Sequence, residues 1–366
     1  MILEPFARDL RRCAICHDQC QFATVEVFAS GRQTLATPRK AMLLEAVRHG
    51  ALDWTPALVD VIYAGLNSGV QHAVCVNRGD PDGWPDETAY LRAARAEIVR
   101  AGRAPAWALA LRDAWAHTGN PYGLPDGEQP VAGGLVFAVD AATRAFHPGA
   151  ATAWAQVLGR LHGPAGRLAT GSSGFELFDL GFVDEARAAA TAWNAQLAAL
   201  GAEAVISDSP EAVYMMTRIW PQWGLTPAAP AQHASTWLAA TLAARNITLP
   251  PTGPPLTFHD PACLARYLGE TAAPRAAAAR LGIPLIEMLR HGEEALPSGS
   301  YYGPAPGAWV RTIAEDRIAS ARATGAHGIL TASQFDYRNL AGALPVLDLG
   351  EAAAARLAWL KPPATR

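Results

Sequence analysis

Cysteine is concentrated near the start of this chain, in a spacing that could hold a metal. Four of the five cysteines lie within the first 75 residues, at Cys13, Cys16, Cys20 and Cys75. The run Cys13-x2-Cys16-x3-Cys20 matches the last three positions of C-x2-C-x2-C-x3-C, the spacing that wraps a cubane iron–sulfur cluster. Leu10 stands where the first cysteine of that pattern would be. The spacing therefore predicts an iron–sulfur site that has lost part of its ligand set.

A second run of the same pattern ends at Cys75 and has no other cysteine. Its three earlier positions hold Gly65, Ser68 and Gln71. In two-cluster ferredoxins the fourth cysteine of each run binds the cluster of the other run. One cluster would then receive Cys13, Cys16 and Cys75, and the other would keep only Cys20. The second cluster is therefore expected to be absent.

The remaining thiolates could be used in several ways. Three of them suit a 3Fe-4S cluster, or a 4Fe-4S cluster whose fourth ligand is Asp9, His17 or water, and a rearranged loop would supply Cys20 instead. Four thiolates in a tetrahedral arrangement also suit zinc, which would make the site structural and redox-inert. The simplest alternative is no metal, with the cysteines buried as small apolar residues. We expect one bound centre, since four cysteines at motif positions stand against a single one elsewhere.

The bulk composition is that of a globular chain. Half of its 366 residues are apolar and 17% are charged, which allows two or three domains with their own cores. A net charge of −3 provides no basic surface for nucleic acid. No apolar run reaches the roughly 18 residues that span a bilayer, and the N-terminus lacks the apolar segment of a signal peptide. The odd cysteine count argues against a disulfide framework, so we expect a cytoplasmic protein.

An internal repeat indicates two similar α/β units. The segment 201–209 matches 325–333 at an offset of 124 residues, and an apolar segment lies upstream of each, at 134–139 and 256–259. Alanine-rich helical patterns lie between these segments, at 151–161, 183–200, 272–281 and 309–324. Strands that alternate with helices predict parallel sheets. The region before the repeats is predicted to be helical, with helices at 40–49, 56–63 and 87–99.

Six short segments carry a resemblance to a known family. They are Cys13–Cys20 with the following Thr37-Pro38-Arg39, then Ser172–Gly181, Asp208–Ala212, His259–Tyr267, Tyr301-Tyr302-Gly303 and Thr331–Asp336. In order and spacing they resemble the iron–sulfur oxidoreductase family with cysteine-rich CCG domains. That family includes heterodisulfide reductase B/C-type subunits and the iron–sulfur subunits of glycolate oxidase and anaerobic glycerol-3-phosphate dehydrogenase.

The resemblance implies a particular layout of the chain. It comprises an α-helical ferredoxin-like domain at 1–105, a connector at 106–130, a first CCG-like α/β repeat at 131–232, a linker helix within 233–255, and a second, pseudo-symmetric CCG-like repeat at 256–366. Where the family has cysteines in its CCG domains, this chain has Ser172, Ser173, Ser209, Ala212, Ala262, Tyr301, Tyr302, Ser333 and Asp336. Cys263 lies one place beyond a family cysteine. Since Ser, Ala and Tyr do not replace thiolates as iron ligands, both repeats are expected to hold no cluster.

Three hypotheses for function follow. The first is an electron-transfer or accessory subunit of an iron–sulfur/flavin oxidoreductase complex, with at most one 4Fe-4S or 3Fe-4S cluster. The resemblance implies a flavin dehydrogenase subunit or a cluster-complete paralogue as partner, and peripheral membrane association through that partner. The second is a redox-inert scaffold subunit with zinc or no metal.

The third hypothesis is an enzyme that uses the cleft between the repeats, with His259, Asp260 and Asp336 as candidate residues. Asp260 is more simply expected to cap a helix, because it precedes a proline. Asp208 and Asp336 are expected near strand ends, where open α/β sheets bind ligands.

Overall fold

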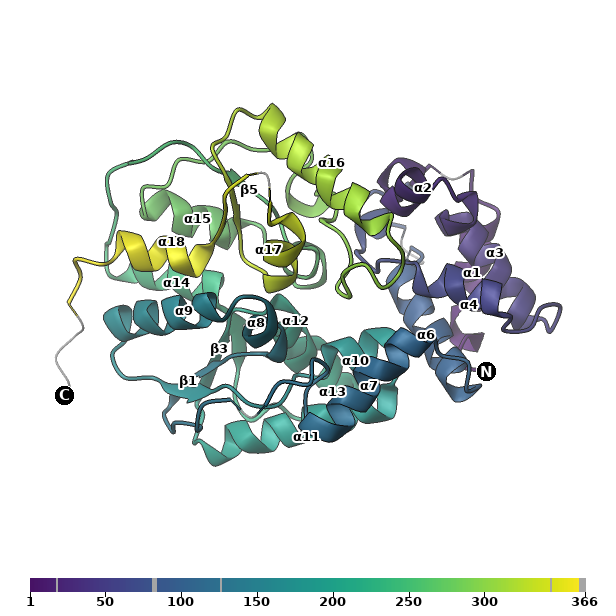
Figure 1. Ribbon diagram of the computed structural model, residues 1–366, viewed down its shortest axis with the longest axis horizontal. Helices are drawn as coiled ribbons and strands as arrows, with labels where there is room; N and C mark the ends of the chain where they lie inside the picture. The colour runs from purple at the N-terminus through teal and green to yellow at the C-terminus, as the bar shows by residue number, and fades with distance from the viewer. Residues whose placement is uncertain (18, 81–83, 126, 343, 362–366) are drawn as a thin grey trace.

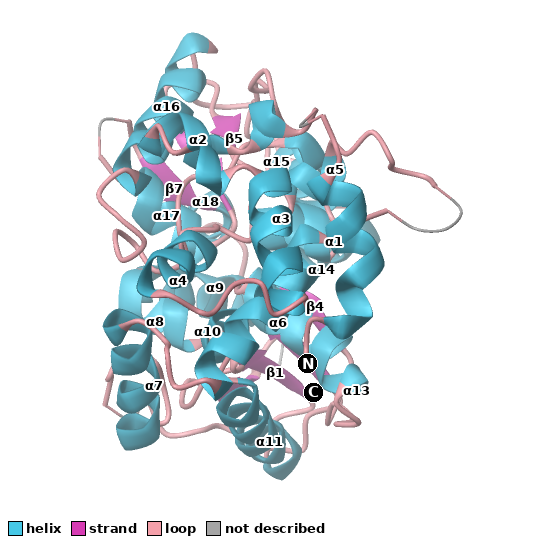
Figure 2. Ribbon diagram, turned by 90° about the vertical axis from the view of Figure 1, so that its right-hand side faces the viewer, coloured by secondary structure: helices cyan, strands magenta, loops and turns pink. Residues whose placement is uncertain are grey.

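The computed structural model describes residues 1–17, 19–80, 84–125, 127–342 and 344–361. Helices at the N-terminal end stand to one side of two parallel sheets (Figure 1). Seen from that side, the strands lie behind a surface made almost entirely of helices and loops (Figure 2). The expected mixture of helices and parallel sheets is confirmed.

The N-terminal helices begin where the sequence provides caps and prolines. They are α1 (Ala7–Ala14), α2 (Val25–Ser30), α3 (Thr37–Arg48), α4 (Pro56–Tyr63), α5 (Val70–Ala73), α6 (Glu87–Arg100) and α7 (Ala106–Thr118). The Thr55 side chain accepts a hydrogen bond from the N–H of Leu58 at the start of α4, and Asp86 caps α6 in the same way. The helices predicted at 40–49, 56–63 and 87–99 are therefore confirmed as α3, α4 and α6.

Helix α7 occupies half of the segment expected to be a connector. Trp107, Leu111 and Trp115 recur every four residues, so they share one face of the helix and pack against the N-terminal core. The sequence between 106 and 118 therefore folds as an element of that core rather than as an irregular crossing.

All strands in the two sheets run parallel. The first sheet has the order β2-β1-β3-β4, and the second has the order β5-β6-β7. The strands are β1 (Leu135–Ala138), β2 (Gly166–Leu168), β3 (Ala204–Ser207), β4 (Ala231–His233), β5 (Thr257–Phe258), β6 (Ile329–Thr331) and β7 (Val346–Asp348). Their carboxyl ends therefore lie on one edge of each sheet, which places Asp208 directly after β3 and Ser333 shortly after β6.

Helices surround the strands and join the two sheets. They are α8 (Ala141–Phe146), α9 (Pro148–Leu161), α10 (Phe175–Leu180), α11 (Val183–Ala199), α12 (Pro210–Tyr214), α13 (Trp220–Gln222), α14 (Ala234–Ala244), α15 (Ala272–Arg280), α16 (Val310–Ala323), α17 (Gln334–Leu340) and α18 (Leu349–Arg356). Helix α9 packs on α18 and α14 packs on α15, so each pair joins the two sheets. One apolar core contains Phe137 and Ile206 from the first sheet and Phe258 and Leu330 from the second.

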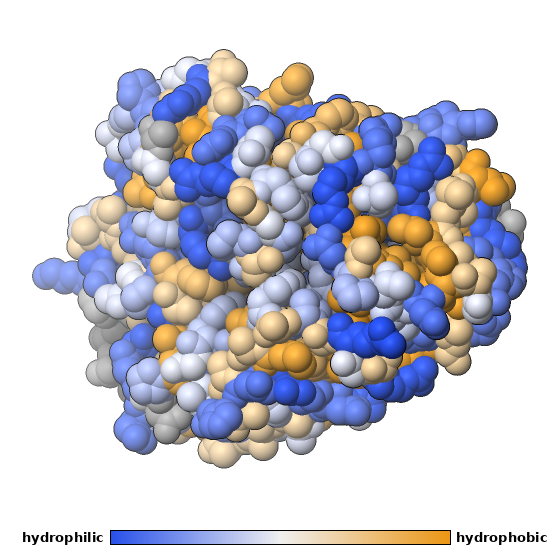
Figure 3. Space-filling view, turned by 45° about the vertical axis from the view of Figure 1, so that its right-hand side comes forward, coloured by the Kyte–Doolittle hydropathy of each residue, from blue (hydrophilic) through white to orange (hydrophobic). Residues whose placement is uncertain are grey.

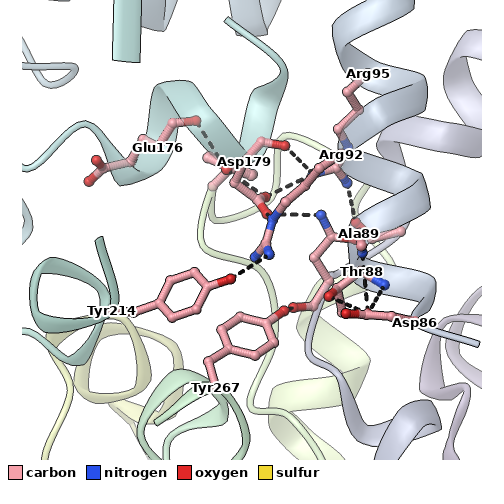
Figure 4. A network of polar contacts seen from close by, with 12 residues as sticks. Asp86, Thr88, Ala89, Arg92, Arg95, Glu176, Asp179, Tyr214 and Tyr267 are labelled. Atoms are coloured by element: carbon pink, nitrogen blue, oxygen red, sulfur yellow. Dashed lines mark hydrogen bonds and ion pairs between the residues drawn. The ribbon is translucent and has the colours of Figure 1, made fainter. Parts of the chain in front are cut away.

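A buried ionic network holds the N-terminal helices against both sheet-containing parts (Figure 4). Asp179 of α10 accepts hydrogen bonds from Arg92 Nε at 2.9 Å and Arg95 Nη1 at 2.8 Å, both from α6. Asn67 Nδ2 and Tyr302 Oη donate to the same carboxylate, each at 2.8 Å. Burial raises the pKa of Asp179, but the charges of Arg95 and Arg92 outweigh it and hold that pKa below its usual range.

Candidate metal centre

The four N-terminal cysteines line one pocket. Cys13 lies in the last turn of α1, Cys16 follows that helix, Cys20 begins a short 3-10 turn, and Cys75 follows α5. All four are half-buried. The other lining residues are Arg12, Thr37, Pro38, Gln71, His72, Asn77, Pro85 and Glu87. Separate segments of the chain thus bring the predicted ligands to one place.

The structure distinguishes among the candidates for a fourth ligand. Leu10 is fully buried in the core of the N-terminal helices and does not line the pocket. Asp9 and His17 do not line it either, whereas Cys20 does. Cys20 therefore lies with the other three thiols, and not in a separate site as the two-cluster pattern would place it.

The four cysteines surround a narrow cavity of about 30 Å³. Within the described ranges, no three His, Cys, Asp or Glu side chains stand close enough together to hold one metal ion. Zinc needs all of its sulfur ligands about 2.3 Å from one atom. A cubane cluster presents several iron atoms at its corners, so its cysteine ligands stand farther apart. The donor set fits an iron–sulfur cluster in type and number.

The environment of Cys13 does not favour an isolated thiolate. Burial, followed by the negative charge of Glu87, raises the pKa of this thiol well above its usual range. A thiol of this kind is a poor nucleophile. Positively charged iron would offset both effects, since metal ligation requires the deprotonated sulfur.

The position expected for the second cluster is filled by protein. A side chain at Gly65 would meet Leu91 Cδ1 at 3.0 Å and Lys40 Nζ at 3.7 Å. Lys40 is fully buried, and its ammonium lies 2.6 Å from a carboxylate oxygen of Glu87. Glu87 also accepts a hydrogen bond from Thr37 Oγ1 at 2.9 Å. An ion pair therefore occupies the space that a thiolate at position 65 would face.

His72 is a pocket residue that the cysteine pattern did not reveal. Its Nδ1 donates to the carbonyl of Pro85 at 3.1 Å, and its ring lies against Trp84 with centroids 4.5 Å apart. In the described part of the chain, Nε2 of this ring has no hydrogen-bond partner. The only sequence signal for His72 is its place three residues before Cys75, within the second degenerate run.

The strand-end residues form a second buried polar group. His259 Nε2 lies 3.0 Å from Asp336 Oδ1, and Arg317 Nε donates to His259 Nδ1 at 3.0 Å. Since Arg317 can only donate, His259 Nδ1 is the acceptor, and Nε2–H donates to Asp336. His259 is 1% exposed, and both of its ring nitrogens are engaged. Both ring nitrogens of His259 are therefore occupied by hydrogen bonds within the protein.

The prediction that Asp260 caps a helix is wrong. Its carboxylate forms a bidentate pair with Arg275, at 2.6 and 2.9 Å, and accepts the N–H of Gly292 at 2.7 Å. Arg275 reaches it from α15 and also binds Glu287. The planar guanidinium group of Arg275 donates one hydrogen bond to each carboxylate oxygen of Asp260. All of these contacts hold Asp260 in one place within the second repeat.

Several positions where the resembled family has cysteines have polar or packing roles in this chain. Ser173 Oγ donates to Asp140 at 2.8 Å, and Ser209 caps α12 by accepting the N–H of Ala212. Tyr301 packs between Phe175 and Phe335, with ring centroids 5.0 and 5.1 Å away. Each of these side chains therefore contacts other residues of the protein at a position where the resembled family has a cysteine.

A comparison with curated proteins finds similarity to a protein named as a ferredoxin. No family model matches the chain. It is 29% identical over 180 residues to a probable membrane-anchored ferredoxin of Chromohalobacter salexigens, and the match covers 44% of this chain. The chain spans only 26% of the length of that relative.

A comparison with solved structures matches a putative Asp/Glu racemase from Yersinia pestis. The TM-score is 0.32 and the sequence identity 16%, over 62% of this chain and 98% of that one. No helix in the described residues is both long enough and apolar enough to cross a membrane.

Proposed function

We propose that this chain is an electron-transfer or accessory subunit that carries a single iron–sulfur cluster on Cys13, Cys16, Cys20 and Cys75. The observation that carries the proposal is the meeting of all four thiols around one pocket. The similarity to a protein named as a ferredoxin supports it. A bound cluster would supply one-electron redox chemistry at that pocket.

The residues around the pocket would tune and protect such a centre. Burial of Cys13 limits water access, and the Glu87 carboxylate places negative charge beside it. Low solvent access and nearby negative charge both favour the oxidised state of a cluster. His72 and Gln71 line the pocket and offer polar groups to cluster sulfurs.

The rest of the chain is proposed to be a scaffold derived from CCG-type repeats. Tyr302 occupies a position where the resembled family has a cysteine, and its hydroxyl donates to Asp179 of the other repeat. Where the resembled family has a cluster ligand, this chain has a residue that joins two parts of the fold. Such a subunit would work beside a flavin dehydrogenase subunit or a cluster-complete paralogue, which would carry out the substrate chemistry.

Anaerobic purification of the full chain with iron, sulfide and zinc analysis tests the proposal. We expect about four irons and four sulfides per chain, and an electron paramagnetic resonance signal after reduction with dithionite. Cys13→Ser should lower the iron content from four to about three per chain, because serine is a poor ligand for iron and three thiolates remain. Cys20→Ser should retain a three-iron cluster, since three thiolates remain.

Cys263→Ser is the control, since Cys263 is a buried cysteine that lies outside the pocket. It should bind as much iron as the parent protein. Zinc in place of iron, or protein without any metal after anaerobic reconstitution, would contradict the electron-transfer role. The redox-inert scaffold would then be the better description.

A further inference from the structure

A cavity of about 500 Å³ lies between the N-terminal helices and the second repeat. It shares no lining residue with the cysteine pocket. Its floor is Val59, Tyr63 and Ala64 of the α4 region, all nearly buried. This volume falls in the range of sites for small organic molecules, roughly 300–1,000 Å³. Figure 3 shows apolar side chains gathered in patches between charged ones on the face that the N-terminal helices present.

The walls of the cavity are aromatic, and Trp107 is held in place by neighbouring rings. Trp54 and Trp107 stand on the helical side, and Pro306 closes it from the second repeat. Trp107 is held edge-on by Tyr63, with ring centroids 5.8 Å apart, and lies 5.4 Å from the ring of Tyr302. Tyr63 is itself fixed by donating its hydroxyl hydrogen to a backbone carbonyl at 2.9 Å. A site with walls fixed in this way loses little entropy when a ligand binds.

The polar groups at the cavity mainly offer hydrogen-bond donors. Arg103 lines it and uses only Nη1, which donates to the carbonyl of Trp54 at 3.0 Å. Across the described ranges, Arg103 has no carboxylate partner, and the indole N–H groups of Trp54 and Trp107 have no acceptor. The one acid at the cavity, Asp60, is already paired with Arg32 at 2.6 Å. Arg103 is exposed and lines the cavity together with the two tryptophans, a combination that matches an anion attached to a flat apolar ring.

We propose that this cavity binds a planar aromatic carboxylate, with its rings against Trp54 and Trp107 and its carboxylate on Arg103. The aromatic walls would bind the ring system through stacking and burial of apolar area. The guanidinium would select acids over neutral analogues. An extended proline-rich peptide is disfavoured, because the buried floor forms a pocket for a single compact molecule and the unpaired cation calls for an anion.

Isothermal titration of the full chain with benzoate, 2-naphthoate and anthracene-2-carboxylate tests this proposal. At least one of these acids should bind with a 1:1 stoichiometry, and the neutral alcohol of the same ring system should bind at least tenfold more weakly. Arg103→Gln should weaken the acid by about tenfold or more and leave the alcohol unchanged. Trp54→Leu should weaken both compounds.

Two variants serve as controls. Arg100→Gln removes an exposed arginine three residues from Arg103 and outside the cavity, and Trp359→Leu removes an exposed tryptophan elsewhere. Both should bind the acid as the parent protein does. The proposal is overturned if no acid of the series binds below about 1 mM, if Arg103→Gln binds the acid unchanged, or if a polyproline peptide binds at Trp54 while the acids do not. The iron and sulfide content of the full chain does not depend on any of these binding results, because the cavity and the cysteine pocket share no lining residue.

Discussion

Replacing Asp179 by asparagine is expected to lower the free energy of unfolding by about 3–5 kcal/mol. The carboxylate is the shared acceptor for Arg92, Arg95, Asn67 and Tyr302, and it is fully buried. Arg95 is 1% exposed, so water cannot replace the lost partner. An asparagine side chain would leave two buried guanidinium groups without a counter-charge and would point N–H groups at hydrogen-bond donors.

The loss should be measured as the free energy of unfolding in urea at neutral pH. Asp113→Asn is the matched control, because Asp113 also pairs with an arginine, Arg112, but on the exposed surface. Exposed pairs of this kind contribute at most about 1 kcal/mol. If Asp179→Asn is no more costly than Asp113→Asn, the network does not hold the fold together. Should Asp179→Asn fail to fold, Tyr302→Phe removes one donor only and is expected to cost about 1–3 kcal/mol.

The same network has a definite dependence on acid. The folded-state pKa of Asp179 is lowered, so its contribution is fully present above the pKa of an unfolded aspartate, about 3.9. It is lost as the pH falls through the lowered value in the folded state. The parent protein and Asp179→Asn should therefore differ in stability at neutral pH and converge in strong acid.

The sequence was informative where a residue type is restricted to few roles. The cysteines at motif spacing indicated the pocket, and the parallel sheets followed from alternating apolar and alanine-rich segments. The sequence could not decide whether Cys20 belongs to the first set of ligands. That choice depends on where Cys20 and the 3-10 turn that follows it pack, which is a matter of tertiary structure.

Other features were hidden because their partners are distant in sequence. Asp179 and Tyr302 are separated by 123 residues, and nothing local marks either as part of a buried network. Strands β4 and β7 have only three residues each, too few to show an alternating pattern. Asp260 looked like a helix cap because of the following proline, whereas Arg275, fifteen residues later, determines its role.

Stability near neutral pH should be limited by a second group of acids, at the contact between the two sheets. Asp208 follows β3, and Asp348 ends β7. The side-chain amide of Gln334 lies between them, with Nε2 at 3.5 Å from Asp208 and 3.2 Å from Asp348. Burial, together with the charge of Asp348, raises the pKa of Asp208 to about 8. Burial also raises the pKa of Asp348 to about 6.

The sign of the pH effect follows from these directions. Below about pH 4 Asp208 is protonated in both the folded and the unfolded chain, so it contributes no pH dependence. Between pH 4 and 8 the unfolded chain releases this proton while the folded chain retains it, because the folded-state pKa is near 8. The free energy of unfolding should therefore fall as the pH rises through this window, and should level off above pH 8.

Asp208→Asn should remove this penalty, since asparagine has no proton to lose. Thr143 Oγ1 can still donate to the amide oxygen, as it now donates to Asp208 Oδ1 at 3.1 Å. Gln334 Nε2 can keep its hydrogen bond to Asp348 at 3.2 Å, so only its longer contact of 3.5 Å with position 208 is lost. The variant should match the parent at pH 4 and exceed its stability by about 3–5 kcal/mol at pH 8. Asp316→Asn, at an exposed site on α16, should follow the parent at every pH. Equal stability of Asp208→Asn and the parent at pH 8 would mean that Asp208 ionises without cost in the folded chain, and that the two sheets meet around charged rather than neutral acids.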